Sequence, residues 1–212
     1  MSKKILIYTE GKSDRFLGWY LNFLKYKDRF DMFDIEGKDK LISGEFLEKI
    51  DKILNNKHQT YKQVCIIFDA DKKESQEIDA GFDNKFEHIC KELKEKRIDF
   101  PREKIFLFPN NQDDGDLETL LLKIANHKEF INCFESYLDC IKKIRKNVLY
   151  AYLEAFGLED LYTKKNIFDT ESKVKDQYKG DYEKLQEVIG FDLKSLVPLK
   201  NFLERSVENN QK

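Results

Sequence analysis

Apolar residues form two kinds of run along roughly the first 125 positions. Short continuous runs rich in β-branched or aromatic residues predict strands, and longer runs with apolar residues three or four positions apart predict helices. The predicted strands cover residues 5–8, 30–35, 64–68 and 105–108. The predicted helices start at Ser13, near 46, near 82 and after Asp116, which we expect to be a helix N-cap. Strand and helix alternate four times, which predicts an α/β fold with a parallel sheet of about four strands flanked by helices.

The second half of the chain has a different pattern. From about Lys128 the apolar residues recur at helical spacing throughout, in residues 130–141, 148–153, 185–189 and 196–203. No segment rich in proline, glycine or serine separates the halves. We therefore expect an α/β domain over residues 1–127, with residues 128–212 as a helical extension of the same globule packed on the sheet.

Composition narrows the functional classes. Of the 212 residues, 41% are apolar and 37% are charged, enough for a core beneath a highly charged surface. The net charge of -2 provides no overall basic field, so tight non-specific DNA binding is not expected, although a local basic patch could still bind nucleic acid. The residues before the first strand are too few for a signal peptide or membrane span, and the four cysteines form no C-x-x-C pair. These features predict a cytoplasmic protein with no membrane association.

Two tempting motifs fail on spacing. Gly11-Lys12-Ser13 lacks the glycine that a P-loop needs five positions earlier, where the chain has Leu6. The acidic turn ending at Asp116 fails as a calcium loop, because with Gly115 in the sixth place the twelfth is Leu121 instead of a bidentate glutamate. Nucleotide binding through a P-loop and EF-hand calcium binding are both excluded.

Acidic residues follow three of the four predicted strands. Glu10 ends the first, Asp69 and Asp71 end the third, and Asp116 and Glu118 follow the fourth. Parallel strands end at one edge of a sheet, so these carboxylates meet if the first and third strands are neighbours. Alternation along an extended chain lets both aspartates of the third strand lean the same way. Such an oxygen-rich site suits Mg²⁺ or Mn²⁺ and phosphoryl transfer chemistry.

The acidic residues form three motifs in order: Glu10-Gly11-x-x-Asp14, Asp69-x-Asp71 and Gly115-Asp116-Leu117-Glu118. Together they resemble the TOPRIM domain, which topoisomerases, bacterial primases, small ribonucleases and OLD nucleases share. The third motif resembles an element of small stand-alone TOPRIM proteins. The resemblance covers roughly residues 4 to 125 and implies a TOPRIM-like, Rossmann-like sheet.

The resemblance also implies roles for individual residues. Glu10, Asp69 and Asp71 would be catalytic, with Glu10 as general acid/base or metal ligand, and these three together with Glu118 would hold Mg²⁺ or Mn²⁺. Gly11 would let the turn pass close to the site, where a Cβ would obstruct. The residues expected to support the site are Gly11, Asp14, Lys72, Gly115 and Asp116.

Each of these residues also has a simpler interpretation. Asp14 and Glu118 lie in first helical turns, where an acid favours the helix dipole. Asp69 and Asp71 are alternatively exposed turn acids, and Glu10 could pair with a lysine such as Lys12 or Lys38. Lys72 either touches a phosphate or offsets the acids.

A basic run offers a candidate nucleic-acid contact. Lys142, Arg145 and Lys146 share one face of a predicted helix, although such runs are more often solvated surfaces. The leading hypothesis is a Mg²⁺- or Mn²⁺-dependent TOPRIM nuclease acting on nucleic acid. The alternatives are a non-catalytic TOPRIM-fold module acting through a protein partner, and a primase-like nucleotidyltransferase.

Overall fold

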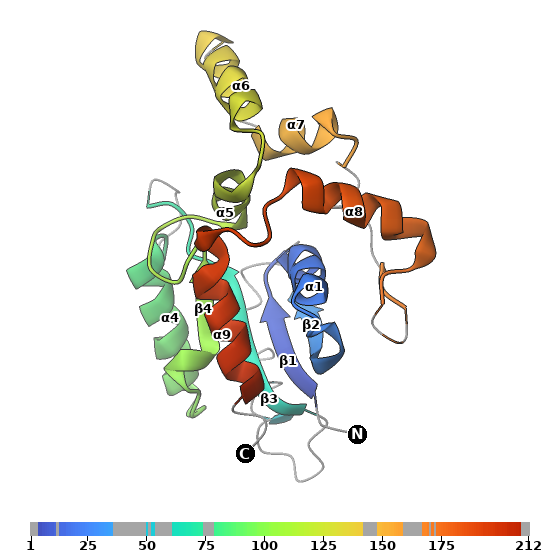
Figure 1. Cartoon of the computed structure of the whole chain (residues 1–212). Coiled ribbons are helices and arrows are strands. Elements are labelled where there is room, and N and C mark those ends of the chain that lie inside the picture. Colours follow the sequence, from blue (N-terminus) through green and yellow to red (C-terminus); the bar gives the residue numbers. More distant parts are fainter. Residues whose placement is uncertain are drawn as a thin grey trace.

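A four-stranded parallel sheet lies at the centre of the protein (Figure 1). The computed structural model describes residues 4–11, 13–35, 50, 52–53, 61–73, 79–141, 148–158, 167–169, 171 and 173–208, with only the backbone described for 137–141. The strands are β1 (Lys4–Thr9), β2 (Phe30–Asp34), β3 (Tyr61–Asp69) and β4 (Ile105–Phe108). Their order is β2-β1-β3-β4, and every neighbouring pair is parallel. The predicted α/β fold with a parallel sheet is confirmed.

The strand register brings the carboxyl ends of the strands to one edge. Thr9, the last residue of β1, pairs with Asp34 of β2 and with Ile67 of β3. Asp69, the last residue of β3, pairs with Phe108, the last residue of β4. β1 and β3 are neighbouring strands. The acidic residues that follow them can therefore share one site, which the sequence alone left open.

Side chains of the sheet are buried on both faces, as the uninterrupted apolar runs require. In β1, Ile5 and Ile7 belong to one hydrophobic cluster, whereas Leu6 and Tyr8 belong to a second. Helices α1 (Ser13–Phe23), α5 (Leu117–Ile124) and α9 (Val197–Glu208) contribute to the first cluster. Helix α4 (Phe82–Glu95) contributes Ile89 and Leu93 to the second. The sheet is therefore the middle layer, with α4 on the face opposite α1, α5 and α9.

The carboxyl-terminal helices complete the first cluster. They include α6 (Lys128–Ile141), α7 (Val148–Ala155) and α8 (Lys179–Val188), and Leu153 of α7 and Leu185 of α8 are buried in the same core as β1. The Tyr152 hydroxyl donates to the Val188 carbonyl over 2.8 Å and joins α7 to α8. The predicted helical extension packed on the sheet is confirmed, with α6 projecting away from the sheet in Figure 1.

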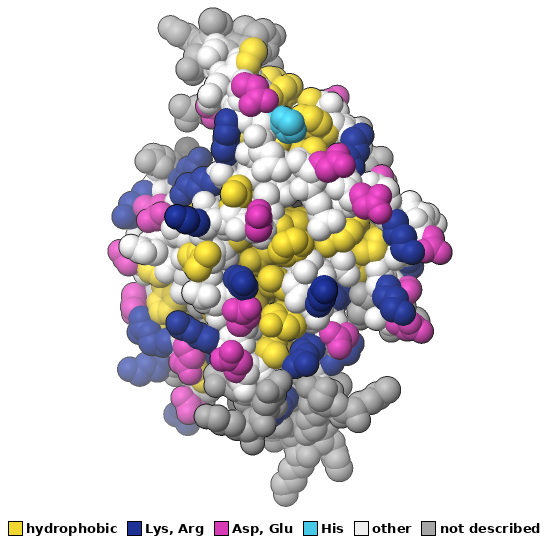
Figure 2. Space-filling model, viewed as in Figure 1, with side chains coloured by type: hydrophobic (Ala, Val, Ile, Leu, Met, Phe, Trp, Pro, Cys, Tyr) yellow, Lys and Arg dark blue, Asp and Glu magenta, His cyan; other side chains and the backbone are white. Residues whose placement is uncertain are grey.

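The remaining elements are short. Single 3-10 turns cover Lys27–Arg29, Arg102–Lys104, Asp176–Tyr178 and Lys194–Leu196. The helix predicted near 46 falls mostly outside the described residues, of which 50, 52 and 53 are helical. No helix in the described part of the chain is both long and apolar enough to cross a bilayer. Figure 2 shows basic and acidic side chains interspersed over the visible face, in keeping with the small net charge.

Candidate functional site

Asp69 lies at the carboxyl end of β3, where three carboxylates act on it. Its side chain follows Ile67 on the face covered by α5, and Asp69 Oδ1 accepts a hydrogen bond from the Leu117 N–H over 2.9 Å. Burial raises the pKa of Asp69 well above its usual value, and the charges of Glu10, Glu118 and Asp116 raise it further. The Leu117 hydrogen bond lowers it, but not enough to compensate. The ionised Asp69 therefore lies in a negative field that a cation would relieve.

Glu10 reaches this field from the end of β1. It is only 7% exposed, and the Ser13 hydroxyl donates to its carbonyl oxygen over 2.7 Å at the start of α1. The following Gly11 has φ +61°, a left-handed conformation that glycine adopts without strain. A Cβ at Gly11 would meet no described atom within 4 Å, so the described protein atoms give no steric reason for this glycine. The turn needs its conformational freedom instead.

Glu118 and Asp116 come from the start of α5. Asp116 is the predicted N-cap: its Oδ1 accepts the Thr119 N–H over 2.7 Å, and Thr119 Oγ1 accepts the Asp116 N–H in return. This reciprocal capping fixes the first turn of α5, which carries Glu118 and the Leu117 amide that holds Asp69. Asp116 thus has a structural role, and it also adds to the field around Asp69. Asp14 lies half-buried in the first turn of α1.

Asp71 departs from the expected arrangement. Its φ of +62° is left-handed, so alternation along an extended strand no longer governs its side chain. Its carbonyl accepts the Gly115 N–H over 2.9 Å, and Gly115 itself has φ +138°. A Cβ on Gly115 would come within 3.0 Å of Thr119 Oγ1, so a close approach is what requires glycine there. Strand alternation therefore does not explain how Asp71 lies relative to Asp69, and their sharing of one site stays a prediction.

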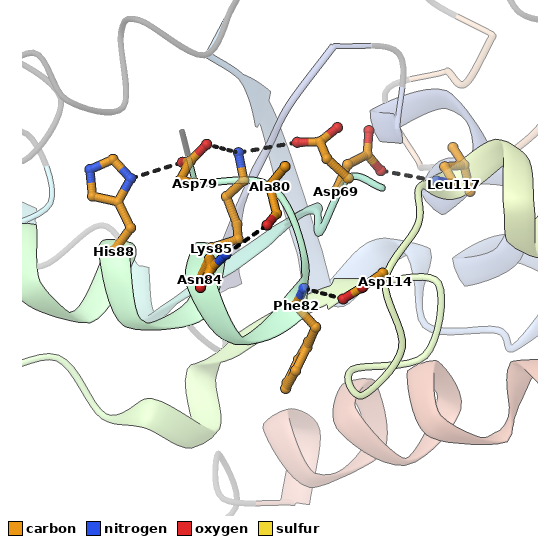
Figure 3. A network of polar contacts seen from close by, with 10 residues as sticks. Asp69, Asp79, Ala80, Phe82, Asn84, Lys85, His88, Asp114 and Leu117 are labelled. Carbon is orange, nitrogen blue, oxygen red and sulfur yellow. Dashed lines mark hydrogen bonds and ion pairs between the residues drawn. The ribbon is translucent and has the colours of Figure 1, made fainter. Parts of the chain in front are cut away.

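The partner of Asp71 is Lys85, on the opposite side of the sheet from α5. Lys85 Nζ lies 3.1 Å from Asp71 Oδ2 and 3.1 Å from Asp79 Oδ1, and the lysine is 5% exposed (Figure 3). His88 Nδ1 lies 2.8 Å from Asp79 Oδ2 and extends the chain of contacts along α4. Asp71, Lys85, Asp79 and His88 are called here the Lys85 network.

Electrostatics favour the charged forms of Lys85 and Asp79. Burial alone would lower the pKa of Lys85, but its contacts with Asp79 and Asp71 outweigh burial and raise it. Burial would likewise raise the pKa of Asp79, yet the hydrogen bonds from His88 and Lys85 lower it. Lys85 and Asp79 are thus an ion pair over the neutral pH range, and Asp71 faces the same ammonium.

The role predicted for Lys72 stays a prediction, whereas a second lysine near the acids was missed. Lys72 is exposed, and the described residues include no ion-pair partner for it. Lys85 was missed, although it lies three positions after Phe82 and four before Ile89, on the buried face of α4. A charge on an apolar helix face needs a buried partner, and this signal was available in the sequence.

Of the four predicted metal ligands, the structure places Asp69 within range of the charges of Glu10 and Glu118, and it pairs Asp71 with Lys85. Three oxygen donors of this kind suit a hard cation such as Mg²⁺ or Mn²⁺. Among the residues described, no three acidic, histidine or cysteine side chains lie in an arrangement that could hold a metal ion. The nucleic-acid candidates Lys142, Arg145 and Lys146 lie outside the described residues.

Comparison with known proteins identified one family. Residues 3–207 match the family model described as "Protein of unknown function (DUF3226)", so the match spans the sheet and the carboxyl-terminal helices alike. No curated protein and no solved structure matches the chain.

Proposed function

The chain belongs to the DUF3226 family of proteins of unknown function, and we propose that it is a Mg²⁺- or Mn²⁺-dependent nuclease with a TOPRIM-like site. The observation that carries the proposal is the environment of Asp69. Burial and the charges of Glu10 and Glu118 raise its pKa, so the ionised group is unfavourable unless a cation is bound. These acids come from two neighbouring strand ends and an adjoining helix start, where open parallel sheets bind their ligands.

In this proposal Asp69, Glu10 and Glu118 hold the ion. A bound divalent ion would lower the pKa of an attacking water and would neutralise charge on a phosphodiester. The chain's own residues orient this set. The Leu117 amide fixes Asp69 Oδ1, and the Asp116 cap fixes the helix turn that bears Glu118. Glu10, which is almost fully buried, is the carboxylate best shielded from solvent and the candidate proton acceptor.

The test is cleavage of labelled single- and double-stranded DNA and RNA with Mg²⁺ or Mn²⁺, compared with the same reactions in EDTA. We expect metal-dependent cleavage that falls at least ~100-fold in Asp69→Asn and Glu10→Gln, the scale of losing one catalytic group. Asp113→Asn is the matched control, because this exposed acid lies in the loop before α5 and outside the field around Asp69. Unchanged cleavage in Asp69→Asn would contradict the proposal.

A non-catalytic module acting through a protein partner is the second candidate. The interspersed surface charges of Figure 2 and the net charge of -2 favour it, because neither attracts a polyanion. Calorimetry with Mn²⁺ separates the two proposals. Binding that is lost in Asp69→Asn supports the nuclease, whereas no binding up to millimolar concentrations supports the module.

A further inference from the structure

A groove runs between strand β4 and helix α9 and is lined by side chains from both elements. Its volume of about 670 Å³ lies within the range of small-molecule sites. We propose that this groove binds the phosphate group of a small molecule through Lys104 and Arg205. The site is separate from the proposed metal site, and the proposal does not depend on that site.

Helix α9 runs antiparallel to β4 along the groove. The Phe202 ring lies 5.4 Å from the Phe106 ring, centre to centre. Four residues later, Ser206 Oγ lies 3.6 Å from Cys65 Sγ. Cys65 comes one position before the β3 residue that pairs with the first residue of β4, so it lies at the level of Lys104. The carboxyl end of α9 therefore meets the amino end of β4, opposite the strand ends that the acidic residues follow.

Lys104 provides a poorly solvated charge at this end of the groove. The residue is only 8% exposed, and among the described residues its ammonium has no hydrogen-bond or ion-pair partner. The ammonium is not one of the fully enclosed atoms, so it opens onto the groove that Lys104 lines. A buried charge requires a counter-charge, because little water is present to screen it. A bound anion would supply this counter-charge.

Arg205 adds a second cation on the face of α9 that lines the groove, and Asn201 lies one turn earlier on the same face. In the described part of the chain, neither side chain has a hydrogen-bond partner. Glu103 and Glu208 also line the groove, but both are exposed and form no ion pair with the described cations. Solvent screens these two carboxylates much more than it screens Lys104.

The types of donor favour phosphate over other anions. Lysine offers a point charge, arginine a planar fork and asparagine an amide N–H, so hydrogen bonds can reach an anion from several sides. A phosphate monoester accepts on three oxygens, whereas a carboxylate has only two. Nearer the carboxyl end of β4, Gln112 and Phe202 offer an amide and an aromatic ring to the remainder of a ligand such as a nucleoside monophosphate.

The experiment is calorimetric titration of the full chain with sodium phosphate, a nucleoside monophosphate or sodium acetate, in EDTA and at constant ionic strength. We expect saturable phosphate binding that weakens at least ~10-fold in Lys104→Met and at least ~3-fold in Arg205→Met, the scale of a lost hydrogen bond to a charged group. Acetate should bind at least ~10-fold more weakly than phosphate. Lys91→Met removes an exposed lysine of α4 outside this groove and is the matched control, with an affinity within about twofold of wild type.

Tighter binding of the nucleotide than of phosphate assigns the groove to a nucleotide, and equal or weaker binding assigns it to free phosphate. Both results support the proposal. Acetate bound as tightly as phosphate, no saturable binding of phosphate or nucleotide up to about 10 mM, or unchanged affinity in Lys104→Met overturns it. Circular dichroism establishes beforehand that the variants are folded. If Lys104→Met does not fold, unchanged affinity in Arg205→Met overturns the proposal, because this exposed side chain lies outside the core.

Discussion

Replacing Lys85 with methionine tests the Lys85 network most directly. Methionine keeps much of the lysine stem, so the packing of α4 against the sheet changes little while the ammonium is lost. Asp71 and Asp79 are then left facing each other's charge without the cation that lies 3.1 Å from each of them. The variant thus separates the effect of the lysine charge on stability from the effect of burying its side chain.

The expected magnitude follows from burial. Lys85 is 5% exposed, and breaking a buried ion pair by removing one partner costs about 3–5 kcal/mol because an uncompensated charge remains. Lys91 on the same helix is the matched control, because its ion pair with Glu95 spans 3.7 Å and its side chain is 71% exposed. Lys91→Met should change the free energy of unfolding by less than about 1 kcal/mol.

The assay is urea unfolding, followed by circular dichroism, at several pH values. The folded pKa of Asp79 is lowered, so its contribution is present above the unfolded value of about 3.9 and is lost as the pH falls through the folded value. The folded pKa of Lys85 is raised, so its contribution is present below about 10.4 and is lost as the pH rises through the folded value. The difference between wild type and Lys85→Met should therefore be largest between these limits and shrink outside them.

Two results would refute this reasoning. A loss below about 1 kcal/mol at neutral pH would mean that the ion pair is no stronger than an exposed one. An equal loss at pH 3 and pH 7 would attribute the effect to packing of the lysine stem and not to its charge. In a double-mutant cycle, Asp79→Asn should make Lys85→Met less damaging, because one of the stranded charges is removed.

Three further predictions concern the acidic edge. Because the pKa of Asp69 is raised, Mn²⁺ binding should strengthen as the pH rises through that pKa, and below it binding should release a proton. Calorimetry in buffers of different ionisation enthalpy measures this proton release, and Asp69→Asn should abolish it. Asp116→Ala removes the cap of α5 and should cost about 0.5–2 kcal/mol in urea unfolding, with a weaker Mn²⁺ affinity if the turn carrying Glu118 is loosened. Gly115→Ala should destabilise by more than about 1 kcal/mol, because φ is +138° and Thr119 Oγ1 lies 3.0 Å from the new Cβ, whereas Gly180→Ala in α8 meets no described atom and should not.

The strands were predictable because their burial is uniform. Residues 5–8, 64–68 and 105–108 lie inside β1, β3 and β4, and the observed strands extend at most three residues beyond these limits at either end. A run buried on both faces has no polar interruption, and a parallel sheet between two helical layers is the arrangement that buries both faces. The order of β1 beside β3 was left open, because hydrophobic pattern alone does not specify which strands pair.

The convergence of Glu10, Asp69 and Glu118 followed from topology, since parallel strands end at one edge whatever their side chains do. The contact between Asp71 and Lys85 could not be predicted in this way. It depends on the left-handed backbone of Asp71 and on a lysine fourteen positions later, in α4. Both features are tertiary: the bridge from Asp71 to Gly115 sets the turn, and packing of α4 on the far face sets the position of Lys85.

The two aspartates consequently answer different physical demands. Asp69 is held by an amide and lies in the field of three carboxylates, which under the proposed function a bound cation would relieve. Asp71 is paired with Lys85, and the ion pairs with Asp71 and Asp79 help to make the burial of this lysine tolerable. If Asp71 were needed as a ligand, a buried lysine beside it would weaken the site. Its presence is therefore an argument that Asp71 holds the structure together, and that the proposed metal site would depend chiefly on Asp69.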